Sequence, residues 1–213
     1  MSLSVSAGAA PAPAARATRA SDAAYRRLRD LIVELRLRPG ALVDEQSLAA
    51  ELGLGRMPVR EAMARLAGDR LVVIMPRRGM IISLIGLDSV REIFEARETI
   101  ECGTAYWAAR HVTDDELAEL RRLIEAAESA RREVAFARFL EDDQHIHHTL
   151  ARAAHNSFVE GAAERLLVHN LRFWRYFAGS WALLMMPIAC RCAAATTRSY
   201  TRGGWHTWYR QGT

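Results

Sequence analysis

The chain has 213 residues, half of them apolar, which is enough for two small domains with hydrophobic cores. No uninterrupted apolar stretch approaches the roughly 20 residues of a membrane-spanning helix, and the N-terminal segment lacks the apolar centre of a secretory signal, so we expect a cytoplasmic protein without a membrane partner. The three cysteines, Cys102, Cys190 and Cys192, form no C-x-x-C pair, which argues against a disulfide framework and against a zinc knuckle.

All 29 basic residues are arginine, and they are unevenly distributed. Residues 1–84 contain 13 arginines and 8 acidic residues, residues 85–178 contain 12 and 17, and residues 179–213 contain 4 and none. A basic N-terminal part and an acidic middle favour one domain that contacts phosphate and a second domain with a different partner.

The N-terminal part predicts a winged helix-turn-helix over residues 21–84. Residues 1–20 are rich in Ala, Pro and Ser and show no hydrophobic period, so we expect a disordered arm there. Three helical segments follow, from Ser21 to the Arg-Pro-Gly at 38–40, over 45–52, and from about 56 to 69. The segments 71–74 and 80–84 flank a Met-Pro-Arg-Arg-Gly turn and predict a two-stranded hairpin, the wing.

Residues 85–178 carry only helical periods and predict an all-α bundle, so the expected fold is mainly α. The expected helices cover 88–110, 114–131, 133–155 and 157–178, and Thr113 with Glu116 forms a capping box at the second of them. Beyond residue 178 the acidic residues and the helical period both end, and residues 179–213 form an atypical tail.

The helix that begins at about Arg56 has two distinct faces. Its predicted core side comprises Val59, Ala62, Met63 and Leu66. The adjoining stripe comprises Arg56, Met57, Arg60 and Ala64 and can face a DNA groove, so Arg56, Met57 and Arg60 are candidate DNA-binding residues. Arginines at positions i and i+4 near a helix N-terminus can reach DNA phosphates or the O6 and N7 atoms of guanine. If these two arginines stood alone in the sequence, the simpler interpretation would be that they are solvated surface side chains.

The hairpin turn adds a second basic feature. Arg77 and Arg78 lie beside Gly79, whose missing side chain allows a close backbone approach. Such a cationic tip suits a minor groove or its flanking phosphates.

The string LRPGALVDE at 37–45, LAAELG at 48–53 and RMPVREAM at 56–63 closely resembles the DNA-binding domain of the GntR family of bacterial regulators, over about residues 24–84. The resemblance implies that Arg56, Arg60 and Gly79 contact operator DNA. Gly55 and Met57 stand where this family usually has Ser and Thr. Because hydroxyl groups are absent there, we expect weaker DNA binding than in a Ser/Thr version.

Asp143 and His147 lie in the middle of the apolar face of the helix over 133–155, whereas His145 and His148 point elsewhere. A buried carboxylate and imidazole must be paired, hydrogen-bonded or metal-bound. From the residues alone, a ligand site and a satisfied core pair are equally good interpretations.

Arg97 to Glu101, the capped helix from Asp114, and DQHIHHTL at 143–150 resemble FCD, the C-terminal domain of the FadR subfamily of GntR regulators. In that subfamily an Asp, a His and two later histidines hold a divalent metal, often zinc or nickel, which helps to bind a small carboxylate effector. The resemblance assigns the first two roles to Asp143 and His147. Arg97 becomes a candidate to bind the effector carboxylate, and a salt bridge within its own helix is the alternative.

The metal site is incomplete in the sequence. His169 and His206 are the only histidines after residue 155, and neither lies in a context that matches the two later ligands. We hypothesise that the reading frame shifts near residue 179, which the other two frames of the DNA would test.

Together these features predict a homodimeric, metabolite-responsive repressor that binds a palindromic operator in double-stranded DNA. A metal-dependent enzyme acting through Asp143 and His147 is disfavoured, because two ligands fix no metal geometry and no nucleophile accompanies them. A DNA-binding protein with a non-functional sensor domain is a third interpretation.

Overall fold

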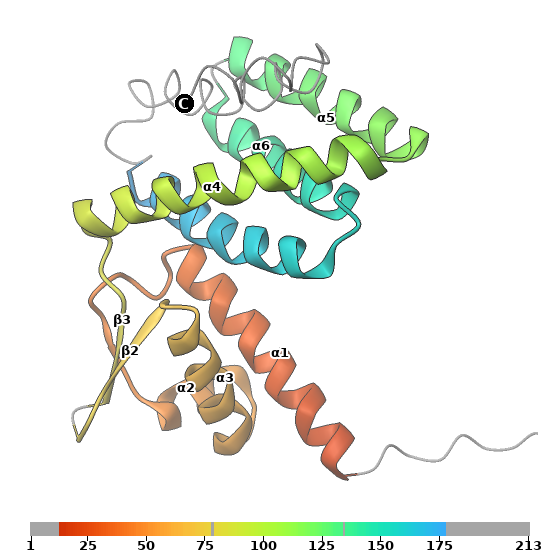
Figure 1. The fold of residues 1–213 in the computed structure, drawn as a ribbon. Coiled ribbons are helices and arrows are strands. Elements are labelled where there is room, and N and C mark those ends of the chain that lie inside the picture. The colour runs from red at the N-terminus through yellow and green to blue at the C-terminus, as the bar shows by residue number, and fades with distance from the viewer. Residues whose placement is uncertain (1–12, 78, 134, 178–213) are drawn as a thin grey trace, which may run out of the picture. The chain divides into compact units, whose positions relative to one another are not determined.

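The computed structural model describes residues 13–77, 79–133 and 135–177 (Figure 1). The chain divides into two compact units, one ending at Leu84 and the other beginning at Ile85. The first unit combines three helices with a small sheet, and the second is helical throughout its described residues. The mainly α fold expected from the sequence is therefore confirmed.

The first helix, α1 (Pro13–Val33), differs from the expectation at both ends. It begins eight residues before Ser21, so residues 13–20 are helical and do not belong to a disordered arm. Pro at the first helical position and the alanines that follow explain the early start, since both favour helix over coil. At the other end, the helix stops at Val33, ahead of the Arg-Pro-Gly segment, and Leu35 adopts a left-handed conformation with φ of 62°.

The next two helices form the helix-turn-helix. α2 (Glu45–Leu52) lies where the sequence predicts it, capped by the Asp44 side chain and ended by Gly53 at φ of 64°. α3 (Arg56–Gly68) packs on both α1 and α2. The Tyr25 hydroxyl of α1 donates to Asp69 at 2.7 Å, just beyond the end of α3. Burial, with the Asp69 carboxylate beside it, raises the pKa of Tyr25 to about 12.

The sheet contains three antiparallel strands in the order β1-β3-β2, namely β1 (Leu42–Val43), β2 (Val72–Met75) and β3 (Gly79–Ile82). The expected hairpin corresponds to β2 and β3. The structure adds a strand that the sequence did not predict, because Leu42 pairs with Ile81 and brings a short third strand to the other edge of β3. Two residues are too short to show an alternating pattern.

The second unit contains α4 (Leu87–His111), α5 (Asp114–Arg132), α6 (Phe136–Ala153) and a further helical segment over 157–177. α6 packs against both α4 and α5. The core includes the side chains Leu120, Leu123, Phe139, Leu140, Leu150, Phe173 and Trp174. The predicted apolar face of α6 is thus the buried one. The expected atypical tail, 179–213, lies outside the described residues.

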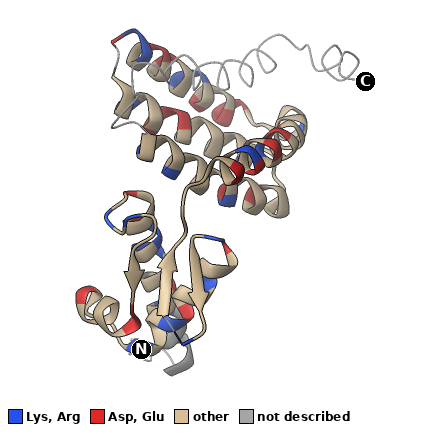
Figure 2. Ribbon diagram, turned by 90° about the vertical axis from the view of Figure 1, so that its left-hand side faces the viewer, with Lys and Arg blue, Asp and Glu red and all other residues tan. Residues whose placement is uncertain are grey.

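Charged side chains of both signs lie along the bundle helices (Figure 2). Several are paired along one helix, such as Arg91 with Glu95 at 3.2 Å on α4. Exposed pairs of this kind contribute little to stability. Among the helices of the described residues, none has both the length and the apolar character needed to cross a lipid bilayer.

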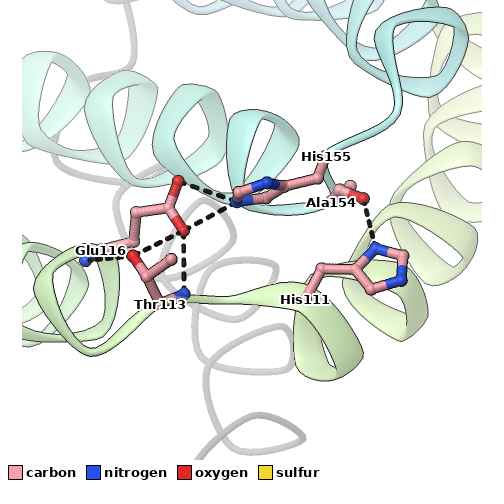
Figure 3. Close-up of polar contacts among 5 residues, drawn as sticks. All are labelled: His111, Thr113, Glu116, Ala154 and His155. Carbon is pink, nitrogen blue, oxygen red and sulfur yellow. Dashed lines mark hydrogen bonds and ion pairs between the residues drawn. The ribbon is translucent and has the colours of Figure 1, made fainter.

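A polar joint connects the start of α5 to the end of α6 (Figure 3). The capping box is formed as predicted: the Glu116 backbone N–H donates to Thr113 Oγ1 at 3.3 Å, and the Thr113 backbone N–H donates to the Glu116 carboxylate at 3.0 Å. His155 Nε2 donates to the same carboxylate at 3.0 Å, and His111 Nδ1 donates to the Ala154 carbonyl at 2.8 Å. The hydrogen bond from the Thr113 backbone, with that from His155, lowers the pKa of Glu116 to about 2.

We expect Thr113→Ala to lower the free energy of unfolding of this unit by about 1 kcal/mol at pH 7, since a helix cap is lost. Glu116→Gln should also destabilise it at pH 7. Because the folded pKa of Glu116 lies below its ordinary value of 4.5, its contribution is present above that value and disappears as the pH falls towards 2.

Urea denaturation followed by tryptophan fluorescence measures both effects, since every tryptophan follows residue 85. Thr99→Ala is the matched control, because its hydroxyl bonds only to the Glu95 carbonyl inside α4. A difference between wild type and Glu116→Gln that stays constant from pH 7 to pH 3 would contradict the assigned role of the carboxylate.

Candidate functional site

α3 separates an apolar face from a basic one. Val59, Ala62, Met63 and Leu66 are fully buried, as the sequence predicts. Arg56, Met57, Arg60 and Ala64, which form the adjoining stripe, are all exposed. Because the four core side chains are buried, the rotation of α3 about its axis is fixed. That rotation determines which side chains can enter a DNA groove.

Arg60 is held in place by Glu45, the first residue of α2. Arg60 Nε lies 3.0 Å from each Glu45 carboxylate oxygen, and Nη2 lies 3.0 Å from Oε2. These bonds raise the pKa of Arg60 above its ordinary value. They occupy the edge formed by Nε and Nη2, which leaves the edge formed by Nη1 and Nη2 for another acceptor. Sequence reasoning missed Glu45, because its partner lies 15 residues away and no local period connects them.

Arg56 lies at the start of α3, near the cap of α2. Asp44 accepts hydrogen bonds from the backbone N–H groups of Ser47 at 2.9 Å and Gln46 at 3.0 Å. The bonds from Ser47, with a smaller contribution from the Arg56 charge, lower the pKa of Asp44. Arg56 and Arg60, two of the three exposed arginines of α3, thus lie in the field of two carboxylates at the N-terminus of α2.

The wing turn places a basic residue between two strands. Arg77 is exposed and adopts φ of 63°, and Gly79 adopts φ of 94°, where a side chain would be strained. A Cβ at Gly79 would also lie 3.6 Å from the Val43 carbonyl oxygen of β1. Arg78, the other predicted wing contact, lies outside the described residues.

A buried polar cluster lies between α4 and α6. Arg97 donates through Nε to Glu101 Oε1 at 2.6 Å, and its Nη2 lies 3.4 Å from His147 Nε2. Asp143 Oδ1 lies 3.6 Å from the same imidazole nitrogen. Burial raises the pKa of Asp143, against the opposing charges of His147 and Arg97. The structure thus brings together Arg97, Asp143 and His147, the three bundle residues predicted from the sequence.

The described residues do not fit a metal ion at this cluster. The positive charge next to His147 Nε2 is the Arg97 guanidinium, and the remaining imidazole nitrogen, Nδ1, lies 3.7 Å from Glu101. Among the described residues, no group of three or more His, Cys, Asp or Glu side chains is arranged to hold a metal. His145 and His148 are exposed, as expected. The helix salt bridge foreseen for Arg97 is formed, with Glu101.

The helical segment 157–177 carries two buried polar residues that sequence reasoning missed. Asn170 is 1% exposed, and neither of its amide atoms has a hydrogen-bond partner among the described residues. Arg172 is also buried, which lowers its pKa to about 10. Asn170 follows Ala163 and Leu167 and precedes Trp174 at helical spacing, so a polar residue at a core position was the available signal.

A winged helix-turn-helix with exposed arginines on its recognition helix, followed by a helical unit, defines a two-domain DNA-binding regulator. The family model for bacterial regulatory proteins of the gntR family matches residues 20–82, and the FCD domain model matches residues 92–182. A relative from Agrobacterium vitis, an uncharacterized HTH-type transcriptional regulator, is 34% identical over 135 residues, which cover 62% of this chain and 79% of the relative. The chain therefore belongs to the GntR family.

Other similar proteins are also regulators. The HTH-type transcriptional repressor RspR of Escherichia coli K12 is 32% identical over 130 residues, 61% of this chain, and the match spans only 57% of the length of RspR. Among solved structures, E. coli McbR/YncC has a TM-score of 0.69 at 20% identity, with 88% of this chain and 90% of that chain covered. This last similarity supports the fold.

We expect Arg97→Ala to destabilise the helical unit by about 3 kcal/mol, because it leaves the carboxylates of Glu101 and Asp143 in a buried site without their cation. Arg91→Ala removes the exposed pair with Glu95 on the same helix and should cost less than about 0.5 kcal/mol. Urea denaturation followed by tryptophan fluorescence compares the two variants, and equal effects would show that the cluster is not electrostatically coupled.

Proposed function

We propose that this protein regulates transcription by binding operator DNA through Arg56, Arg60 and the wing residues Arg77, Arg78 and Gly79. One observation carries the proposal: four fully buried side chains fix the rotation of α3, and this leaves Arg56 and Arg60 exposed on the stripe beside the buried face. Recognition helices of this architecture insert such a face into the major groove. The acidic residue that accompanies Arg60 is neutralised by it, so the surface can approach phosphates.

The DNA-bound form that we propose is a homodimer on a palindromic operator, acting as a repressor in the cytoplasm. A two-fold dimer presents two recognition helices to half-sites about one helical turn apart. The name of RspR, a transcriptional repressor, supports the direction of regulation.

The helical unit is the proposed sensor for a small carboxylate. Arg97 provides a guanidinium fork suited to a carboxylate, inside a buried polar cluster. Phe94, one turn before Arg97, meets the rings of Phe173 and Trp174 edge to face, with centroid distances of 5.7 Å and 6.3 Å. Segment 157–177 runs opposite to α4 (Figure 1), and its Asn170 lies about one turn before Phe173, the residue that contacts Phe94. A buried amide without a partner is costly, and a ligand would relieve that cost.

A metal ion has no part in this proposal, because the described residues do not form a site for one. Binding of the carboxylate would instead shift the population between dimers that bind DNA and dimers that do not. The effector and the operator are thereby thermodynamically coupled, and each weakens the binding of the other.

The first experiment measures DNA binding by fluorescence anisotropy, with duplexes from the region upstream of the protein's own gene. We expect the double variant Arg56→Ala, Arg60→Ala to lose affinity on the order of 100-fold, since each well-placed arginine contact contributes about 1–3 kcal/mol. Wild-type affinity should also fall steeply with salt concentration.

The matched control is Arg121→Ala with Arg122→Ala, which removes the same charge from two exposed positions on α5. If the two double variants lost affinity for DNA equally, the binding would be a non-specific attraction between net charges. Absence of any wild-type binding with sequence preference would refute the proposed function.

The second experiment adds small mono- and dicarboxylates to the protein–DNA complex. We expect at least one of them to release the DNA and to raise the melting temperature of the free protein. Arg97→Lys keeps the charge but not the planar fork, so it should bind DNA normally and respond at least tenfold more weakly. A ligand that acts equally on wild type and Arg97→Lys would place the sensor site elsewhere.

A further inference from the structure

Met57 is a large apolar side chain on the exposed face of the recognition helix. Its side chain is 59% exposed, although every other large apolar residue of α3 is fully buried. At about 100° per residue, Met57 and Ala64 point almost directly away from the buried face of the helix. The core therefore cannot cover Met57, whichever rotamer it adopts.

The position of Met57 along α3 matches that of a base contact. It is the second residue of the helix, and recognition helices present their N-terminal residues to base edges. Arg60 is its neighbour one turn later, on the same side of the helix. Glu45 pairs with the Nε and Nη2 edge of Arg60, which leaves the Nη1 and Nη2 edge of the guanidinium for an acceptor on the DNA.

The major groove contains one apolar group that could match this side chain. The base edges present hydrogen-bond donors and acceptors to the groove, and the C5 methyl group of thymine is the exception. We propose that Met57 is a specificity-determining residue that packs against the C5 methyl group of a thymine, at a base pair next to the one that Arg60 contacts. This inference rests on the proposed DNA-binding function and adds a base preference to it.

The test uses the full-length chain and a duplex that the wild-type protein selects from a random pool. Each thymine of this duplex is replaced in turn by deoxyuridine, which removes only the C5 methyl group and leaves base pairing unchanged. We expect one thymine per half-site at which the replacement weakens wild-type binding about fourfold, the value for one buried methyl group.

The same deoxyuridine duplex should bind Met57→Ala as tightly as the thymine duplex does, because the contact is already absent. Leu87→Ala is the matched control, since Leu87 is another exposed apolar residue, on α4 of the other unit. It should keep the wild-type response. The measured quantity is the ratio of the affinities for the two duplexes. A substitution at position 57 that weakens binding to both duplexes equally therefore does not affect the result.

Two outcomes would overturn the inference and leave the proposed function intact. One is a wild-type protein that tolerates deoxyuridine at every thymine. The other is a fourfold loss that persists in Met57→Ala, which would assign the methyl contact to another side chain, such as Ala64. Failure of the wild-type chain to select any sequence would refute both the inference and the proposed function.

Discussion

The packing of α3 against α1 and α2 is the constraint on which the proposed activity depends. Val59, Ala62, Met63 and Leu66 are buried completely, and together they determine how α3 is rotated about its axis. A rotation of one residue would move Arg60 sideways and expose part of the core. The side chains available to DNA are therefore selected by hydrophobic burial, before any base is contacted.

In the helical unit the main constraint is different, because charged side chains are buried between α4 and α6. Arg97, Glu101, Asp143 and His147 lie within 2.6 to 3.7 Å of one another, so the charge of each buried group has an opposite partner nearby. Such a cluster adds little net stability compared with an apolar core, but removal of one member is costly. In the proposed sensor, a carboxylate ligand at Arg97 would exchange with one of these partners.

The sequence was most informative where one local period determines the structure. The bounds of α2, the buried face of α3 and the Thr113 capping box all follow from residues within a few positions of one another. Interactions between distant segments were missed: β1 pairs with β3 across nearly 40 residues, Glu45 reaches Arg60 from another helix, and Asn170 is an isolated polar residue in an apolar period. The two pairings leave no signal in a local window, whereas Asn170 leaves one, as a polar residue at a core position of a helical period.

The bond between Glu45 and Arg60 also affects the entropy of association. A free arginine side chain loses about 2 kcal/mol of rotamer freedom when it is immobilised, and this loss weakens binding. Because Glu45 pairs with Arg60 in the free protein, part of that ordering precedes the arrival of DNA. A carboxylate that repels phosphate at long range can therefore favour complex formation at short range, through the rigidity that it gives to its partner.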